Sequence, residues 1–89
     1  MKKYKLDYTT DARKALKKLD NSIKKRIIDW IEKNLEDCEN PRKNGKPLTG
    51  NLKGNWRYRV GDYRIIAKIE DEEILITVID VNHRRQIYR

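Results

Sequence analysis

The stretch Asn55–Arg64, NWRYRVGDYR, restricts the fold of this chain more than any other part of its 89 residues. Large apolar side chains alternate with arginines in its first half, and this period of two is typical of a β-strand with one buried face. The pair Gly61-Asp62 then suits a two-residue hairpin turn, because glycine supplies a positive φ at the first position. The stretch therefore predicts a β-hairpin whose return strand runs from Tyr63 to Ile69.

The turn also determines which residues face each other across this hairpin. With the Gly-Asp pair in the loop, Arg59 pairs with Arg64, and directly paired residues share a sheet face. Arg57 joins them on that face, whereas a slip of one residue would expose Trp56 to solvent. Three clustered arginines have two interpretations, a solvated outer face or a phosphate-binding site. Acids close in sequence lie at turns, and the planar guanidinium suits phosphate oxygens, which favours the phosphate site.

The first part of the chain predicts a strand and two helices. Apolar residues alternate over 4–8, which indicates a short strand with one buried face. Thr9-Thr10-Asp11 supplies helix N-cap residues, and apolar stripes follow at helical spacing over 12–19 and 23–35. We expect a helical hairpin whose second helix reaches about Cys38.

The remaining segments complete the predicted fold. Residues 39–55 hold both prolines and three of the four glycines, which favours a loop. Residues 74–81 are apolar enough for an inner strand. We expect a single α+β domain over residues 1–89, with a short N-terminal strand, a helical hairpin and a three-stranded antiparallel meander. The helices should pack on one face of the sheet.

The charge of the chain points to its class of partner. Lys and Arg number 22 against 14 Asp and Glu, for a net charge of +8. Such an excess favours nucleic acid, an acidic protein or an anionic membrane surface, although a soluble domain can also simply be basic. Six of the nine arginines fall in residues 54–89, where there is one lysine. This shift towards arginine in the second half favours phosphate recognition.

Several classes of protein are excluded by what the sequence lacks. It has no apolar run long enough to span a membrane or serve as a secretory signal, so we expect a cytoplasmic protein with no membrane partner. One cysteine and one histidine exclude an internal disulfide and a structural zinc site, and we expect no metal and no cofactor. Cys38 is interpreted as a small residue at a helix end rather than a nucleophile.

The segment VNHRRQIYR, residues 81–89, is a second candidate site. His83, Arg84 and Tyr88 can respectively transfer a proton, hold a phosphate and stack on a base or donate a proton. The alternatives remain open, because a lone histidine is more often an ordinary surface residue and Tyr88 can equally be a packing residue.

The segments LKGNWRYRVGDYRIIAKI and VIDVNHRRQIY resemble the RelE/ParE superfamily of toxins from bacterial and archaeal toxin–antitoxin pairs. The resemblance extends over nearly the whole chain, because the strand and helical hairpin that precede these motifs also occur in that family. The RelE branch cuts messenger RNA in the ribosomal decoding site. An antitoxin wraps and inactivates the toxin, and the pair often represses its own operon, with the antitoxin contacting operator DNA.

The resemblance implies functional residues at matching positions. The residues that the resemblance implies, or that we infer, to be catalytic are Arg57, Arg59, Arg64, His83, Arg84 and Tyr88. The further RNA-binding residues that we expect are Lys46, Lys53 and Arg85. This chain departs from the best-known RelE toxins at 57 and 59, where those toxins carry lysines. Arginine, with a pKa above about 12, does not serve as a general base. The departure therefore raises the importance of His83, whose ordinary pKa of about 6.5 suits proton transfer.

The sequence thus predicts the toxin of a toxin–antitoxin system, a ribosome-dependent mRNA endonuclease that uses the ribose 2′-hydroxyl to attack the adjacent phosphate. Its expected partners are the ribosome, messenger RNA and a cognate antitoxin with an acidic and apolar segment. Two alternatives are a ParE-like toxin that poisons DNA gyrase and an inactive nucleic-acid-binding relative. Which group acts as general base and which as general acid is left open.

Overall fold

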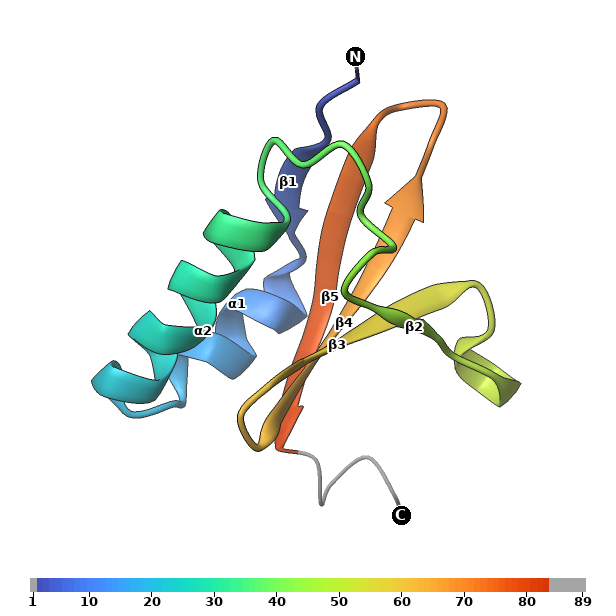
Figure 1. The fold of residues 1–89 in the computed structure, drawn as a ribbon. Coiled ribbons are helices and arrows are strands. Elements are labelled where there is room, and N and C mark those ends of the chain that lie inside the picture. The colour runs from blue at the N-terminus through green and yellow to red at the C-terminus, as the bar shows by residue number, and fades with distance from the viewer. Residues whose placement is uncertain (1, 84–89) are drawn as a thin grey trace.

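A five-stranded sheet forms the body of the protein, and two helices cover one of its faces (Figure 1). The computed structural model describes residues 2–83. The elements in chain order are β1 (Lys5–Tyr8), α1 (Thr10–Lys17), α2 (Asn21–Asn34), β2 (Lys46–Pro47), the 3-10 helix η1 (Gly50–Leu52), β3 (Asn55–Val60), β4 (Tyr63–Glu70) and β5 (Leu75–His83). The strands lie in the order β1-β5-β4-β3-β2. The predicted α+β class is confirmed.

The helices form where the apolar stripes predicted them. Thr9 caps α1 by accepting a hydrogen bond from the Ala12 backbone N–H at 3.1 Å. The second helix ends at Asn34, so the prediction that it reaches Cys38 was wrong. Asp37 has a φ of 59°, a left-handed conformation that an α-helix does not contain. In the part of the chain that the structure describes, no helix is long and apolar enough to cross a membrane.

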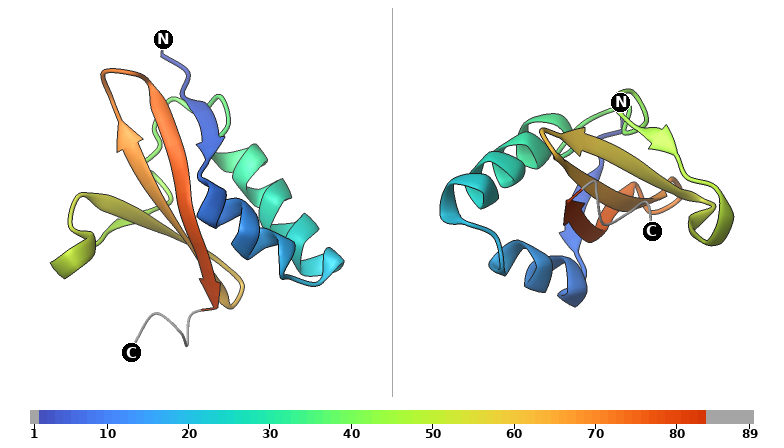
Figure 2. Two further views of the ribbon diagram at one scale, coloured as in Figure 1. Left: turned by 180° about the vertical axis from the view of Figure 1, so that it is seen from behind. Right: turned by 90° about the horizontal axis from the view of Figure 1, so that it is seen from below.

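The β3–β4 hairpin has the predicted register. Gly61 has a φ of 60°, and Arg59 pairs with Arg64 across the turn. Tyr58 and Ile65, the pair on the opposite face, are fully buried in the core beneath the helices. The arginines therefore lie on the face of the sheet opposite the helices. Figure 2 shows from two further directions that both helices lie on one side of the sheet.

Two strands pair in ways that the sequence did not predict. The segment 39–55, expected to be a loop, contains β2, which pairs antiparallel with β3 at the edge of the sheet. It also contains η1. Proline is compatible with an edge strand because the outer side of such a strand needs no backbone N–H donor. At the other edge, β1 pairs in parallel with β5. The final strand also extends to His83, a residue that was expected to follow it.

A β-bulge interrupts the pairing of β4 with β5. Ile66 pairs with Asp80, while the next residue, Ala67, pairs with Val78, so Ile79 is the extra residue on β5. The Thr9 hydroxyl donates to the Ile79 carbonyl at 3.2 Å. The same hydroxyl therefore supports both the first turn of α1 and the bulge.

Candidate nucleic-acid interface

The open sheet face carries a hollow of about 290 Å3 lined mainly by cations. Its lining residues are Asn44, Lys46, Arg57, Tyr58, Arg59 and Arg64. We call it the arginine hollow. It gathers three of the predicted catalytic residues and one predicted RNA-binding residue from β2, β3 and β4.

Strand register explains why these cations meet. Arg57 and Arg59 alternate along β3, Arg64 lies opposite Arg59, and Lys46 on β2 lies opposite Arg57. The four side chains therefore share one face. Arg64, next to the central strand β5, is only 5% exposed, whereas Arg59 is exposed. The cluster thus extends from the surface into the sheet.

The cations on the accessible side of this hollow are not neutralised by nearby acids. Among residues 2–83, no carboxylate lies within 4.0 Å of the charged groups of Lys46, Arg57 or Arg59. Like charges held together repel, and a bound anion removes this repulsion. Guanidinium groups offer planar, paired N–H donors that match phosphate oxygens. The arrangement is suited to an anion with several oxygens.

Close packing fixes the segment that carries Asn44 and Lys46. The Tyr58 hydroxyl donates to the Pro41 carbonyl at 2.5 Å, and burial raises the pKa of Tyr58. A Cβ atom at Gly45 would lie 2.7 Å from Cε1 of that same ring, so only glycine lets the chain pass so near. Asn44 was not predicted as a lining residue. A β-branched or aromatic pattern that would have marked β2 is absent from this segment.

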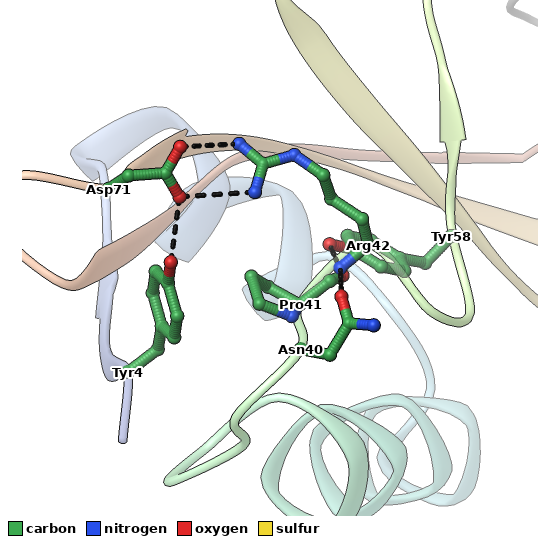
Figure 3. Close-up of polar contacts among 6 residues, drawn as sticks. All are labelled: Tyr4, Asn40, Pro41, Arg42, Tyr58 and Asp71. Carbon is green, nitrogen blue, oxygen red and sulfur yellow. Dashed lines mark hydrogen bonds and ion pairs between the residues drawn. The ribbon is translucent and has the colours of Figure 1, made fainter. Parts of the chain in front are cut away.

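Arg42, in the same segment, connects it to Asp71 of the β4–β5 turn (Figure 3). Its guanidinium donates to both carboxylate oxygens of Asp71, at 3.1 and 2.9 Å, and lies 5.5 Å from the Trp56 ring centre. The Tyr4 hydroxyl donates to Asp71 at 2.7 Å. The hydrogen bonds from Arg42 and then from Tyr4 lower the pKa of Asp71. Arg42 therefore belongs to an ion pair, apart from the cations of the arginine hollow.

The structure does not bring His83 into the arginine hollow. His83 pairs with Tyr63, whose ring lies on the helix side of the sheet, and the two rings meet edge to face with centres 5.2 Å apart. His83 lines a separate hollow of about 460 Å3 beside Lys14 and Lys18 of the α1 region. The two sets of predicted catalytic residues that can be placed thus lie on opposite faces.

The other predicted residues fall into two groups. Arg84, Arg85 and Tyr88 lie outside the described residues. Lys53 follows η1 and does not line the arginine hollow.

Burial raises the pKa of the Cys38 thiol, in keeping with a packing residue. Across residues 2–83, no three His, Cys, Asp or Glu side chains form a group suited to a metal ion.

Comparison with known proteins gives the family of the chain. Residues 6–88 match the family model described as the ParE toxin of the type II toxin–antitoxin system parDE. Two toxins of Mycobacterium tuberculosis are similar over 86 residues, 97% of this chain. Toxin RelG is 35% identical over 97% of its own length, and Toxin RelE is 30% identical over 87% of its length.

Solved structures agree with this assignment. A chain of the RelBE2 toxin–antitoxin complex from Mycobacterium tuberculosis superposes with a TM-score of 0.82 at 32% identity, covering 94% of both chains. The isolated Escherichia coli RelE toxin, at 23% identity and a TM-score of 0.71, shares the fold over 96% of this chain and 90% of its own. The chain therefore belongs to the RelE/ParE superfamily and is a toxin of a type II toxin–antitoxin system.

Proposed function

We propose that this toxin is a ribosome-dependent mRNA endonuclease that inhibits translation in the cytoplasm. The observation that carries the proposal is the arginine hollow, which holds four cations on an open sheet face. Within residues 2–83, no carboxylate lies beside its three more accessible members. The names of the similar mycobacterial toxins, RelG and RelE, support the nuclease branch of the superfamily.

In the proposed reaction, all the covalent bonds to phosphorus that form and break belong to the RNA. The ribose 2′-oxygen attacks the adjacent phosphorus as its proton is removed, and the bond from phosphorus to the leaving 5′-oxygen breaks. That oxygen takes a proton, leaving a 2′,3′-cyclic phosphate and a 5′-hydroxyl. Negative charge builds up on the phosphoryl oxygens, and fixed guanidinium donors stabilise it. Arg57, Arg59 and Arg64 have this role, with Arg84 as a further phosphate ligand.

Proton transfer is assigned to other residues. Arginine holds its proton at physiological pH, so the three arginines of the hollow bind the phosphate without acting as the base. His83 and Tyr88 remain the candidates for proton transfer. His83 lies on the helix side of the sheet, away from the arginine hollow. It can take part only if the RNA reaches from one face to the other or if the chain around β5 moves toward the arginine hollow.

The proposal is tested in a translation extract with purified toxin. We expect message to be cut at the ribosome, and Arg59→Ala, an exposed change, to slow cutting by about 10²–10³-fold, the usual effect of losing one transition-state donor. Arg13→Ala, which removes an exposed arginine paired at 4.0 Å with Asp7, is the matched control and should cut normally. Intact message at toxin concentrations that stop translation would disprove the proposal.

One observation favours a second candidate, because the matching family model is that of the ParE toxin. A ParE-like toxin would poison DNA gyrase, and only this alternative predicts DNA breaks trapped on gyrase in a cleavage assay. If the toxin traps breaks on gyrase and the arginine hollow serves only RNA, the Arg59→Ala variant should trap as many breaks as the unaltered toxin. Harmless overexpression without any antitoxin would instead indicate an inactive relative.

We also propose a cognate antitoxin with an acidic and apolar segment that wraps the toxin. The structures that this chain resembles include toxin–antitoxin complexes from Mycobacterium tuberculosis and Pyrococcus horikoshii. The net charge of +8 supports an acidic partner. Expression of the toxin with the neighbouring gene should restore growth that the toxin alone arrests, and the purified complex should bind its operator through the antitoxin.

A further inference from the structure

A third hollow of about 370 Å3 lies at the β-bulge, and Asp11, Asp80 and Asn82 line both it and the hollow that contains His83. The lining residues of this third hollow are Asp11, Leu52, Ile66, Ile79, Asp80 and Asn82. We call it the bulge hollow. No residue in it belongs to the predicted catalytic or RNA-binding set.

The bulge hollow adjoins the arginine hollow through paired residues of the sheet. Ile66 lies opposite Arg57 of β3 on one side and opposite Asp80 of β5 on the other. Arg64 lies opposite Asn82. Directly paired side chains are about 4.5–5.5 Å apart at Cβ. The two hollows are therefore close enough for adjacent groups of one extended ligand to reach both.

The floor of the bulge hollow is apolar. Ile66 is 3% exposed although it lies on the face away from the helices and outside the core cluster beneath them. Ile79 is brought to the hollow by the bulge, a device that changes the direction of a side chain. Leu52 of η1 is 41% exposed. Leu52 and the partly exposed Ile79 therefore offer apolar atoms to a ring, and the buried Ile66 lines the same hollow.

Asp80 and Asn82, two of the three polar residues that line the bulge hollow with Asp11, are held by hydrogen bonds and keep acceptor atoms. One carboxylate oxygen of Asp80 accepts from the Val81 backbone N–H at 2.8 Å, and the other accepts from the Asn82 amide at 2.6 Å. A carboxylate has about four acceptor sites, so Asp80 keeps further acceptor capacity. The Asn82 amide donates to Asp80 and leaves its carbonyl oxygen as an acceptor. The ligand that fits supplies N–H donors from the edge of a ring.

We propose that the bulge hollow binds one unpaired RNA base that presents N–H donors on its Watson–Crick edge, with Asp80 as the residue that sets base preference. The inference rests on the proposed function, because the phosphate beside this base occupies the arginine hollow. Guanine presents a ring N–H and an amino group side by side to a carboxylate. Uracil presents one N–H between two carbonyl oxygens, which face the carboxylate unfavourably.

The test measures binding and needs neither a ribosome nor cleavage. Short oligouridines with every 2′-hydroxyl methylated carry guanine, hypoxanthine or uracil at one central position, and their affinities for the toxin are compared at fixed salt. We expect guanine to bind roughly fivefold or more tighter than uracil, with hypoxanthine, which lacks the amino group, between them. Asp80→Asn should bring the three affinities together. Glu72→Gln, which removes a charge from the exposed β4–β5 turn, should preserve the differences.

Each outcome bears on the inference separately from the proposed nuclease activity. Equal affinities in the unaltered toxin, or an unchanged guanine preference in a folded Asp80→Asn variant, would overturn the inference even if message is cut normally. Leu52→Ala should weaken all three oligonucleotides alike. If it instead leaves RNA binding unchanged and weakens only the antitoxin complex, the hollow belongs to a protein partner and the inference is wrong.

Discussion

Asp71 is held by side chains from two distant parts of the chain, Tyr4 before β1 and Arg42 in the segment before β2. Both partners favour its charged form, and they connect the β4–β5 turn to the segment that carries Lys46. The residue types on their own did not predict this contact, since Arg42 and Asp71 are 29 positions apart. The capping role of Thr9 was predictable because its partner, Ala12, is three residues away.

The stabilising effect of this ion pair should depend on pH. The pKa of Asp71 in the folded chain lies below its ordinary value of 3.8. Its contribution to the free energy of unfolding is therefore complete above 3.8 and is lost as pH falls through the lowered folded value. Wild-type protein should be more stable than Asp71→Asn at neutral pH, with the difference shrinking under strong acid. Urea unfolding over a pH series measures this.

The control for this prediction is Glu73→Gln, which removes a charge from the same turn. The hydrogen bonds that Tyr4 and Arg42 donate to this turn go to Asp71 and not to Glu73. Its stability relative to wild type should not follow the Asp71 profile. A constant difference between wild type and Asp71→Asn down to strong acid would show that the ion pair contributes nothing.

At the scale of elements, local patterns were sufficient for the β3–β4 hairpin and for the two helices, apart from the end of α2. The apolar periods, the Thr9 cap of α1 and the Gly61 turn each depend on neighbours in the chain, and all three were predicted. Strand β2 has two residues and includes Pro47, so it shows no period to detect. The parallel pairing of β1 with β5 joins the two ends of the described chain, and no local signal encodes it. The placement of His83 on the helix side follows from the β4–β5 register, in which His83 pairs with Tyr63.

Gly45 should control whether β2 completes the arginine hollow. Alanine there would place its Cβ 2.7 Å from the buried Tyr58 ring, and the strand would have to move away from β3. We expect Gly45→Ala to weaken RNA binding several-fold because Lys46 leaves its place opposite Arg57, the loss of one partly exposed contact being worth about 1 kcal/mol. Binding to a methylated oligouridine measures this.

The matched control for Gly45→Ala is Gly50→Ala. Gly50 has a φ of 66° and open space around it, so alanine there costs about 1–2 kcal/mol of backbone strain without touching the arginine hollow. It should lower stability and leave RNA affinity unchanged. Equal losses of affinity in both variants would show that Gly45 acts only through stability.

The whole molecule has a net charge of +8, and the composition predicted a polyanionic partner. Composition did not predict which cations are available. Arg42 pairs with Asp71, and Arg13 and Lys25 each have an acid within 4.0 Å, whereas Lys46, Arg57 and Arg59 share one hollow without one among residues 2–83. Pairing in space, which depends on the fold, decides the binding face.

Salt should weaken RNA binding in proportion to the cations in contact with phosphate. Single strands lose affinity with a log–log slope of about −0.7 per neutralised phosphate, so the four cations of the arginine hollow predict a slope of roughly −2 to −3. Arg57→Ala should make the slope shallower by about 0.7. Affinity measured over a salt series tests this, with Arg13→Ala as the control that keeps the slope. An unchanged slope in Arg57→Ala would place the RNA elsewhere.

The position of β5 has a consequence for how the toxin is made. This strand lies between β1 and β4, yet it is the last strand of the described chain to leave the ribosome (Figure 1). Until it emerges, β1 has no partner and Arg64 lacks its neighbour Asn82. The nascent chain can form its helices and the β3–β4 hairpin but cannot complete the sheet. The toxin therefore cannot reach its complete fold until the part of the chain that forms β5 has been made.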